Sequence, residues 1–393
     1  MKARDFVGLF IICRLILLIS LPLEGLRGFG DFAHFYQLAG MGWPFLDIWV
    51  EFPPVFPIIS RVLYLLAGGK EHIYDYLLVI MMTLAQAGSL WIFIRLAEKT
   101  QPANQAIQNA WVYFALTLCL PYGWWYFDSL VVMAILLSAL WIFEGREAEA
   151  GVAIAIGTLT KFFPALALPM IWRWSDWRRR LIVLFTTLGI TLAVYAGLYA
   201  ASPAQTLASM RSQAAKGSWE TVWALVDGNF NTGNFGPESE RYDPSTAQQL
   251  RGNPARLPSW LTLIPFAALG GWLFCHVRLK SMRAAMGFLG VTWCLFLLWS
   301  PGYSPQWVLY LLPIILLALP MRRAWLFAVI LTLVNVLEWP VMLSRGYNWG
   351  LWLTILMRTM IWILLAVEFW REAKKSDQMR ERTEADWIIP DLT

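Results

Sequence analysis

The feature that most constrains this chain is a series of apolar runs, many close to twenty residues long, that recurs from one end to the other. A run of about 20 apolar residues is long enough to cross the hydrocarbon core of a bilayer as a helix. The pattern therefore predicts an all-α polytopic membrane protein with about 10–12 transmembrane helices. The candidate segments fall near 6–23, 53–67, 73–97, 107–121, 127–143, 150–172, 181–201, 259–277, 284–299, 305–320, 323–342 and 351–370.

Composition supports a membrane protein. Only 15% of the residues are charged, whereas a soluble chain carries about 25%. Many tryptophans stand where apolar runs end, as Trp172, Trp339 and Trp349 do, and their amphipathic rings prefer the membrane interface. The net charge of +5 is typical of basic cytoplasmic loops, and no basic stripe with interleaved aromatic residues predicts a nucleic-acid partner.

Lysine and arginine in short loops set the expected orientation. Basic residues at 2–4, 178–180 and 322–323 place both termini in the cytoplasm. We expect a multi-pass protein of the cell inner (cytoplasmic) membrane, with a transmembrane domain over 1–370 and a charged cytoplasmic tail over 371–393. Two long outer loops, 24–52 and 202–258, are called here the first and second polar segments.

Two apolar runs, 53–67 and 150–172, are interrupted by prolines. Each crosses the bilayer or dips into it and returns, so the sequence allows twelve crossings or ten. Broken backbone at membrane depth needs protein or a water-filled cavity around it. A broken segment therefore indicates a cavity.

Three carboxylates lie among aromatic residues in the first polar segment: Asp31, Asp47 and Glu51. A carboxylate close to a low-dielectric surface has a raised pKa and can serve as a general base. The alternative is that these are solvated loop charges, or that Asp31 caps a short helix beginning at Phe32.

Lys161 lies inside an otherwise apolar run, three residues before Pro164. An intramembrane lysine costs about 2.5–3.5 kcal/mol, so it has an anionic partner or faces a wet cavity. The anionic head group of a lipid would suit it, and so would a structural ion pair with Glu338. Arg61 is placed to snorkel or to face the cavity. Arg14 and Arg358 are placed to pair with Glu338 or to hold a lipid phosphate.

Three other regions carry polar or aromatic side chains. The turn 300–307 holds Tyr303 and Gln306, which suit hydrogen bonds to sugar hydroxyls, although its prolines and glycine already explain a tight turn. Asp128 follows a cluster of aromatic residues that also reads as an interfacial belt. The second polar segment contains aromatic residues that favour a packed structure: Trp219, Trp223, Phe230 and Phe235.

A metal centre is not expected, because the histidines His34, His72 and His276 are scattered without ligand spacing. The acidic first polar segment could still hold Mg²⁺ or Mn²⁺ through oxygen ligands. No glycine-rich nucleotide loop is present, so a soluble nucleotide-sugar donor is not supported and no cofactor is predicted.

Taken together, these motifs resemble the GT-C class of membrane glycosyltransferases, and they look most similar to glycosyltransferase family 87, the polyprenol-phosphate-mannose-dependent mannosyltransferases. The pieces that carry the resemblance are short but occur in order: Asp31 to Tyr36, Pro44 to Asp47, Glu51 to Pro54, Tyr126 to Ser129, Lys161 to Pro164, and Ser300 to Trp307.

The resemblance implies a GT-C-like bundle with juxtamembrane helices in the first polar segment. It implies an inverting transfer of a sugar, expected to be mannose, from a polyprenyl-phosphate donor to a hydroxyl of a lipid or glycan acceptor on the outer face. Asp31 matches the catalytic base, with Asp47 and Glu51 as alternatives. On this hypothesis Lys161, Arg61 and Arg27 neutralise the donor phosphate. Membrane lipids are expected to surround the enzyme. The expected substrate-binding residues are His34, Tyr36, Asp47, Glu51, Asp128, Tyr303 and Gln306.

The main alternative is a polytopic transporter or flippase of a lipid-linked or anionic substrate. Such a protein would be expected to show a two-half repeat and carboxylates at the membrane midplane. Neither is evident in the sequence, where the acids gather in the first polar segment.

Overall fold

The computed structural model describes residues 2–21, 23–27, 31–233 and 236–386, without the side chains of Leu26, Ala214 and 376–386. Phe235 and the end of the predicted tail, 387–393, lie outside the described residues. The described chain is mostly helical, with isolated β-bridges but no strands. The longer helices are α1 Ala3–Ser20, α3 Phe32–Met41, α4 Val55–Leu66, α5 Glu71–Thr100, α6 Ala103–Cys119, α7 Asp128–Phe143, α8 Glu147–Thr160, α10 Trp177–Ala201, α11 Pro203–Ser212, α13 Ser259–His276, α14 Met282–Trp299, α15 Val308–Ala318, α16 Met321–Val336 and α17 Leu351–Asp386. Short elements join them: α2 Leu23–Arg27, η1 Pro121–Gly123, η2 Phe163–Ala167, α9 Leu168–Trp174, η3 Gln213–Ala215, α12 Val222–Asp227, η4 Glu238–Tyr242, η5 Pro244–Gln248, η6 Pro305–Trp307, η7 Leu337–Met342, η8 Leu343–Arg345 and η9 Asn348–Gly350.

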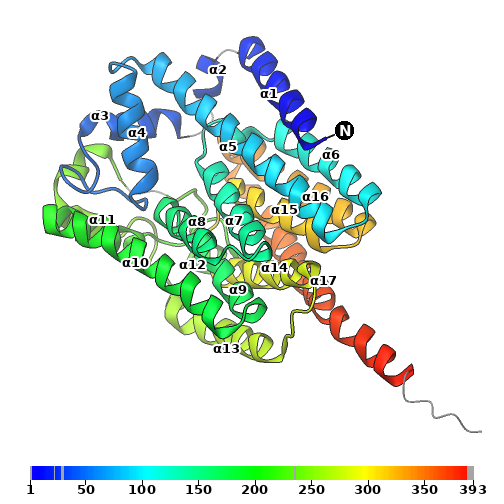
Figure 1. Cartoon of the computed structure of the whole chain (residues 1–393). Helices are drawn as coiled ribbons and strands as arrows, with labels where there is room; N and C mark the ends of the chain where they lie inside the picture. Colours follow the sequence, from blue (N-terminus) through cyan, green and yellow to red (C-terminus); the bar gives the residue numbers. More distant parts are fainter. Residues whose placement is uncertain (1, 22, 28–30, 234–235, 387–393) are drawn as a thin grey trace, which may run out of the picture.

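Six helical stretches within the described residues are long and apolar enough to cross a membrane. They are Glu71–Thr100, Trp177–Ala201, Ser259–His276, Met282–Trp299, Met321–Arg345 and Asn348–Lys375. Together with shorter apolar helices they form one bundle, from which α17 projects (Figure 1). The prediction of an all-α polytopic membrane protein is confirmed.

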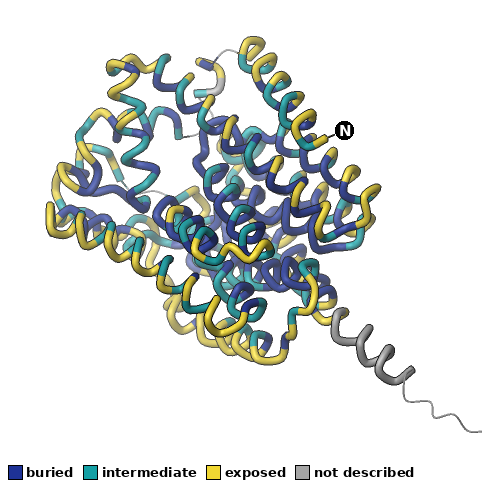
Figure 2. The backbone as a smooth tube through the Cα atoms, in the orientation of Figure 1, coloured by how far each residue is buried: buried dark blue, intermediate teal, exposed yellow. Residues whose placement is uncertain are grey.

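Burial separates central helices from peripheral ones. In their most apolar stretches, α5 and α14 are 67% and 61% buried, whereas α10 and α13 are 11% and 6% buried. Figure 2 shows the outer sides of α10 and α13 as exposed. Their exposed residues are apolar, including Phe185, Leu192, Trp260 and Ile264. On a soluble protein, exposed apolar faces that extend along two whole helices would drive association. The outer faces of α10 and α13 are therefore suited to contact lipid.

The two proline-interrupted runs do not form single spanning helices. α4 contains 12 residues and is therefore about 18 Å long, little more than half of the hydrocarbon thickness. α8 ends at Thr160, because Pro164 has no N–H to donate to the Thr160 carbonyl. The chain turns at Lys161 and continues through η2 into α9.

Close packing holds this break against its neighbours. A Cβ added at Gly157 of α8 would lie 2.7 Å from Cγ of Pro164 and 2.8 Å from Cβ of Ala134 in α7. Only glycine leaves room for this approach, so α7, α8 and η2 meet tightly just before Lys161. The residues after the break are thereby fixed in position.

The predicted tail does not begin as a separate element. α17 runs without interruption from the membrane stretch to Asp386. Within the tail, Glu372 and Ala373 are still buried, and Glu372 lies 3.6 Å from Arg283 at the start of α14. The first turn of the tail therefore packs on the bundle.

A candidate active site between the two polar segments

A cavity of about 910 Å³ lies where the two polar segments meet the end of the helix bundle. It is lined by both polar segments, by the break after α8 and by the turn that follows α14. We call it the central cavity. Its charged and titratable lining residues are Asp31, His34, Glu51, Tyr126, Lys161, Lys216, Glu220, Glu238 and Arg241, and its other polar lining residues are Gln213, Thr232, Ser300, Ser304 and Gln306.

Asp31 stands at the N-terminus of α3, which begins at Phe32 as the capping alternative predicts. Its side chain nevertheless makes no capping hydrogen bond, and within the described part of the chain its carboxylate has no hydrogen-bond or ion-pair partner. Burial raises the pKa of the Asp31 carboxyl above its ordinary value, and the charges of His34 and Lys216 only partly oppose this. Asp31 is thus a cavity-facing carboxyl that binds a proton more tightly than an exposed aspartate does.

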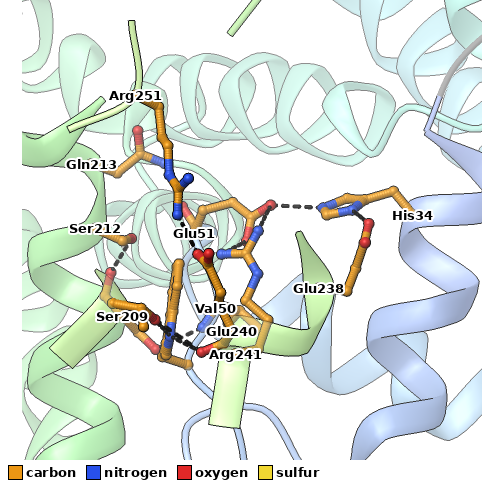
Figure 3. A network of polar contacts seen from close by, with 12 residues as sticks. His34, Val50, Glu51, Ser209, Ser212, Gln213, Glu238, Glu240, Arg241 and Arg251 are labelled. Atoms are coloured by element: carbon orange, nitrogen blue, oxygen red, sulfur yellow. Dashed lines mark hydrogen bonds and ion pairs between the residues drawn. The ribbon is translucent and has the colours of Figure 1, made fainter. Parts of the chain in front are cut away.

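Glu51 differs from Asp31, because its carboxylate forms ion pairs with two side chains, His34 and Arg241. His34 lies between two acids, with Nε2 at 2.7 Å from Glu51 Oε1 and Nδ1 at 2.9 Å from Glu238 Oε1 (Figure 3). Arg241, buried like Glu51, approaches Glu51 Oε2 to 3.2 Å. We call these four residues, His34, Glu51, Glu238 and Arg241, the His34 cluster.

Electrostatics fixes the charges of this cluster. Burial alone would raise the pKa of Glu51, but His34 and Arg241 lower it to about 2. Burial alone would lower the pKa of His34, but Glu51 and Glu238 raise it to about 9. At neutral pH the cluster therefore contains an imidazolium and a guanidinium facing two carboxylates.

Neighbouring contacts make the cluster a joint between the two polar segments. The Arg241 guanidinium lies 4.0 Å from the centroid of the Trp49 ring, and Trp49 N donates to the Arg241 carbonyl at 3.0 Å. Ser209 Oγ accepts from Val50 N at 3.0 Å, and Gln213 donates to the Glu51 carbonyl. These contacts hold Trp49, Val50 and Glu51 against α11, η3 and η4.

Lys161 is paired within the protein, although not with Glu338 as one alternative proposed. Its Nζ donates to Asp128 Oδ1 at 2.8 Å, and Tyr310 donates to the same oxygen. Three aromatic rings surround the ammonium, with centroids 5.1–5.4 Å away in Phe127, Phe163 and Trp307. Lys161 lines the central cavity, while Asp128 lies behind it.

Glu338 belongs to a second buried group, with Glu220 and Arg358, which we call the Glu220 cluster. Arg358 donates to the Glu338 carboxylate and to the Glu220 carbonyl. The carboxyl group of Glu220 lies close enough to that of Glu338 for the two negative charges to oppose each other. Burial raises the pKa of Glu220 well above its ordinary value, and Glu338 adds to the shift.

Glu220 also has an unusual backbone, with φ of +52°. A non-glycine residue in the left-handed region costs about 1–3 kcal/mol and persists only where its surroundings hold it. Here Trp219 N donates to the Pro301 carbonyl at 3.2 Å, and Tyr303 N donates to the Trp219 carbonyl at 3.1 Å. These two backbone hydrogen bonds attach the second polar segment to the turn after α14.

The second polar segment contributes residues that sequence reasoning did not select: Lys216, Glu220, Glu238 and Arg241. Charged residues in a long loop are ordinary, and nothing local distinguishes these from exposed ones. The aromatic residues behave unevenly, because Trp223 Nε1 donates to the Leu298 carbonyl at 3.1 Å whereas Phe230 is exposed.

Several residues selected from the sequence lie away from the central cavity. Arg27 pairs with Glu71 and Asp75 of α5. Arg61 donates to the Ala39 carbonyl at 2.7 Å. Arg14 donates to the Gly123 carbonyl at 2.6 Å and lies over the Trp124 ring.

The hydrogen bonds of three other selected residues also point elsewhere. Tyr36 donates to the Gly69 carbonyl at 2.7 Å. Asp47 accepts from Trp43 N at 2.7 Å in an exposed turn. The buried Tyr303 hydroxyl donates to Asn335 Oδ1 at 2.6 Å. The structure therefore brings together Asp31, His34, Glu51, Lys161 and Gln306 on the cavity wall.

An apolar groove of about 630 Å³ adjoins the central cavity. It runs between α9, α13 and α14, and apart from Thr292 its lining consists of apolar, aromatic and glycine residues. Leu166, Phe296 and Trp299 line both hollows. The two spaces are therefore neighbours that share a wall, one charged and one suited to hydrocarbon. Within the described residues, no group of three or more His, Cys, Asp or Glu side chains is placed to hold a metal ion.

The helical bundle and the charged cavity define a multi-pass membrane protein with an enclosed polar site. The chain belongs to glycosyltransferase family 87, whose sequence model matches residues 49–301, more than half of its length. Comparison with curated proteins and with solved structures gave no match. The protein is thus a membrane glycosyltransferase that uses a sugar donor and an acceptor. The matched range contains Glu51, Lys161, Lys216 and Glu220, and it begins after Asp31.

Proposed function

We propose that this glycosyltransferase transfers a sugar, expected to be mannose, from a polyprenyl-phosphate donor to a hydroxyl of a lipid or glycan acceptor, with inversion at the anomeric carbon. The observation that carries the proposal is the central cavity itself. Asp31, a carboxyl without a hydrogen-bond or ion-pair partner among the described residues, faces a space that adjoins an apolar groove suited to hydrocarbon. A nucleotide-linked donor would have no use for such a groove.

Asp31 is the proposed base because the alternatives are occupied. Glu51 is held as an anion by His34 and Arg241, so its affinity for a proton is low. Asp47 lies outside the cavity and accepts from Trp43 N. The raised pKa of Asp31 brings its proton affinity closer to that of a working base, and a positioned base contributes about 10²–10⁴-fold in rate.

In the proposed reaction, Asp31 takes the proton of the acceptor hydroxyl while the acceptor oxygen attacks the anomeric carbon. The bond between that carbon and the phosphate oxygen breaks on the opposite side. The polyprenyl phosphate leaves with the bonding electrons, and a nearby cation stabilises its charge. Stabilisation of this kind contributes several kcal/mol.

The membrane setting follows from the same proposal. A lipid-linked donor requires an enzyme within the bilayer, and the exposed apolar faces of α10 and α13 suit that environment. We place the cavity on the outer face of the cell inner membrane, with both termini in the cytoplasm. The reaction as written uses no cofactor.

The test is sugar transfer by the purified enzyme in nanodiscs, with radiolabelled polyprenyl-phosphate mannose as donor and extracted membrane lipids as acceptors. We expect Asp31→Asn to abolish transfer while leaving expression and elution unchanged. Glu24→Gln neutralises an exposed acid of the same segment and serves as the matched control. Full activity of Asp31→Asn would move the base to Asp47 or Glu51, or end the proposal. Absence of transfer by the wild type from this and other polyprenyl-phosphate sugars would overturn the donor class.

A further inference from the structure

Lys216 lines the wall of the central cavity, and its neighbours fix the position of its side chain. It follows η3 in the second polar segment, and its Nζ lies 3.8 Å from the centroid of the Trp219 ring. Trp219 is itself fixed, because its backbone is clipped to the turn after α14 and its Nε1 donates to Ser304 Oγ at 3.3 Å. The ammonium therefore rests on a rigid aromatic platform.

Two glycines make this arrangement possible. A Cβ added at Gly233 would lie 2.2 Å from Cε and 2.3 Å from Nζ of Lys216. A Cβ added at Gly302 would lie 2.1 Å from the nearest ring atoms of Trp219. Larger residues at either place would displace the lysine or its platform. The ammonium is thus held by close packing, unlike that of a surface lysine, which moves freely.

We propose that Lys216 binds the phosphodiester of the lipid-linked donor and stabilises the negative charge on the departing lipid phosphate. This inference rests on the proposed function and names the residue that recognises the donor. Lys216 and Asp31 line the same cavity, so one cavity holds both a base for the acceptor and a cation for the leaving group.

The cations selected from the sequence are less suited to this task. Arg27 pairs with two acids of α5, and Arg61 donates to the Ala39 carbonyl; neither lines the cavity. Lys161 lines it, but its charge is already compensated by Asp128 at 2.8 Å. A phosphate that approached Lys161 would compete with that carboxylate. We therefore assign Lys161 to holding the chain break in place beside the site.

The surroundings of Lys216 give its charge a distinctive pH dependence. Burial lowers the pKa of Lys216 to about 7, although Glu51 and Asp31 act to raise it. An anion that binds beside the ammonium favours the charged form and raises this pKa. Donor binding above pH 7 should therefore take up a proton, and affinity should fall as pH rises. Among the described residues, the charged and titratable groups that line the cavity with Lys216 are Asp31, His34, Glu51, Tyr126, Lys161, Glu220, Glu238 and Arg241.

The test is calorimetric binding of a short-chain polyprenyl phosphomannose to the full-length enzyme in nanodiscs, without acceptor, between pH 6 and 8.5. A phosphodiester keeps one negative charge over this range, which also lies below the pKa of His34, about 9. For the wild type we expect affinity to decline above pH 7, with proton uptake visible when buffers of different ionisation enthalpy are compared.

Two substitutions separate charge from structure. Lys216→Met should weaken binding roughly 10- to 100-fold at pH 6.5, the range for losing a charged hydrogen bond. Lys216→Arg should keep most of the affinity but make it nearly independent of pH, because a guanidinium stays charged. Lys99→Met is the matched control, since Lys99 pairs with Glu144 and does not line the cavity.

The outcomes distinguish the two proposals. Equal affinity of Lys216→Met and the wild type, or a wild-type pH profile in Lys216→Arg, would overturn the role of Lys216 alone. Failure of the wild type to bind any polyprenyl phosphodiester would overturn the donor class, and the inference with it. An unchanged unfolding midpoint in Lys216→Met would show that its weaker binding is not caused by misfolding.

Discussion

Two ionic clusters, one partly and one fully buried, flank the central cavity, and they differ in their balance of charge. The His34 cluster sets two cations against two carboxylates and holds the pKa of Glu51 at about 2. The Glu220 cluster sets one arginine against two carboxyl groups, and the pKa of Glu220 is raised well above its ordinary value. The first joins the two polar segments to each other, whereas the second joins a polar segment to the helices that contain Glu338 and Arg358.

The comparison shows how two buried glutamates, Glu51 and Glu220, acquire pKa shifts of opposite direction. Glu51 and Glu220 are both almost fully buried, and burial alone raises the pKa of each. Partners then decide the outcome: two cations overcome the burial of Glu51, while a second acid adds to that of Glu220. The same Glu→Gln substitution should therefore have different consequences in the two clusters.

The largest effect is expected for Glu51→Gln. This change leaves His34 and Arg241 without the carboxylate that balances them, and breaking a buried pair costs about 3–5 kcal/mol. The free energy of unfolding, measured by SDS titration in mixed micelles, should fall by this amount relative to Glu24→Gln. A loss below about 1 kcal/mol would show that the cluster is more hydrated than its burial indicates.

The next effect is the pH dependence of the His34 cluster. The pKa of His34 is raised from 6.5 to about 9, so its contribution is complete below pH 6.5 and is lost as pH rises through 9. This shift corresponds to about 3 kcal/mol. The lowered pKa of Glu51 gives a contribution that is complete above pH 4.5 and is lost as pH falls toward 2. Unfolding midpoints measured from pH 3 to 10 should therefore show both limbs, and a flat profile above pH 7 would contradict the charge assigned to His34.

A smaller effect is expected for Glu220→Gln. Burial and the neighbouring Glu338 already disfavour a charge on Glu220, so a neutral amide changes little, and the free energy of unfolding at pH 7 should change by no more than about 1 kcal/mol. The pKa of Glu220 is raised, so its contribution is complete below pH 4.5 and declines as pH increases. Asp31 has the same sign, so the informative quantity is the difference from the wild type: the substitution should reduce the decline between pH 5 and 6.5. A loss as large as that of Glu51→Gln would show that Glu220 is ionised.

The smallest effect is expected for Asp47→Asn, which changes an acid of the first polar segment that belongs to neither cluster. Its side chain accepts one hydrogen bond from Trp43 N in an exposed turn, and the amide oxygen can do the same. Unfolding should change by about 0.5 kcal/mol or less. A larger change would reveal a third charged contact between the polar segments.

The sequence was sufficient for features that depend on local order. Apolar runs predicted the helices, Pro164 predicted the break beside Lys161, and one of the alternatives for Asp31 placed the start of a short helix at Phe32. These results depend on residues only a few positions apart. The membrane class could be predicted from the apolar runs alone. The family resemblance could be predicted because its short motifs occur in a fixed order along the chain.

The pairing of charges was not accessible. Lys161 could have paired with Glu338 or with a ligand, and the structure gives it Asp128 instead. The partners in the His34 cluster come from both polar segments, with Glu51 and Arg241 far apart in the chain. Such contacts depend on how η4 packs against α3 and how α11 packs against the residues before Glu51, which no local pattern encodes. Lys216 was overlooked because its significance depends on Gly233 and Trp219.

The wall shared by the apolar groove and the central cavity has a consequence for lipid selection. The groove has a volume of about 630 Å³, so the proposed lipid-linked donor would contact it only along the part of its tail nearest the head group, and the rest of the tail would remain in the bilayer. Tail length would then govern how long the substrate dwells near the enzyme, while chemistry next to the head group would govern whether it is accepted. Truncated lipids that fill the groove should accordingly serve as donors.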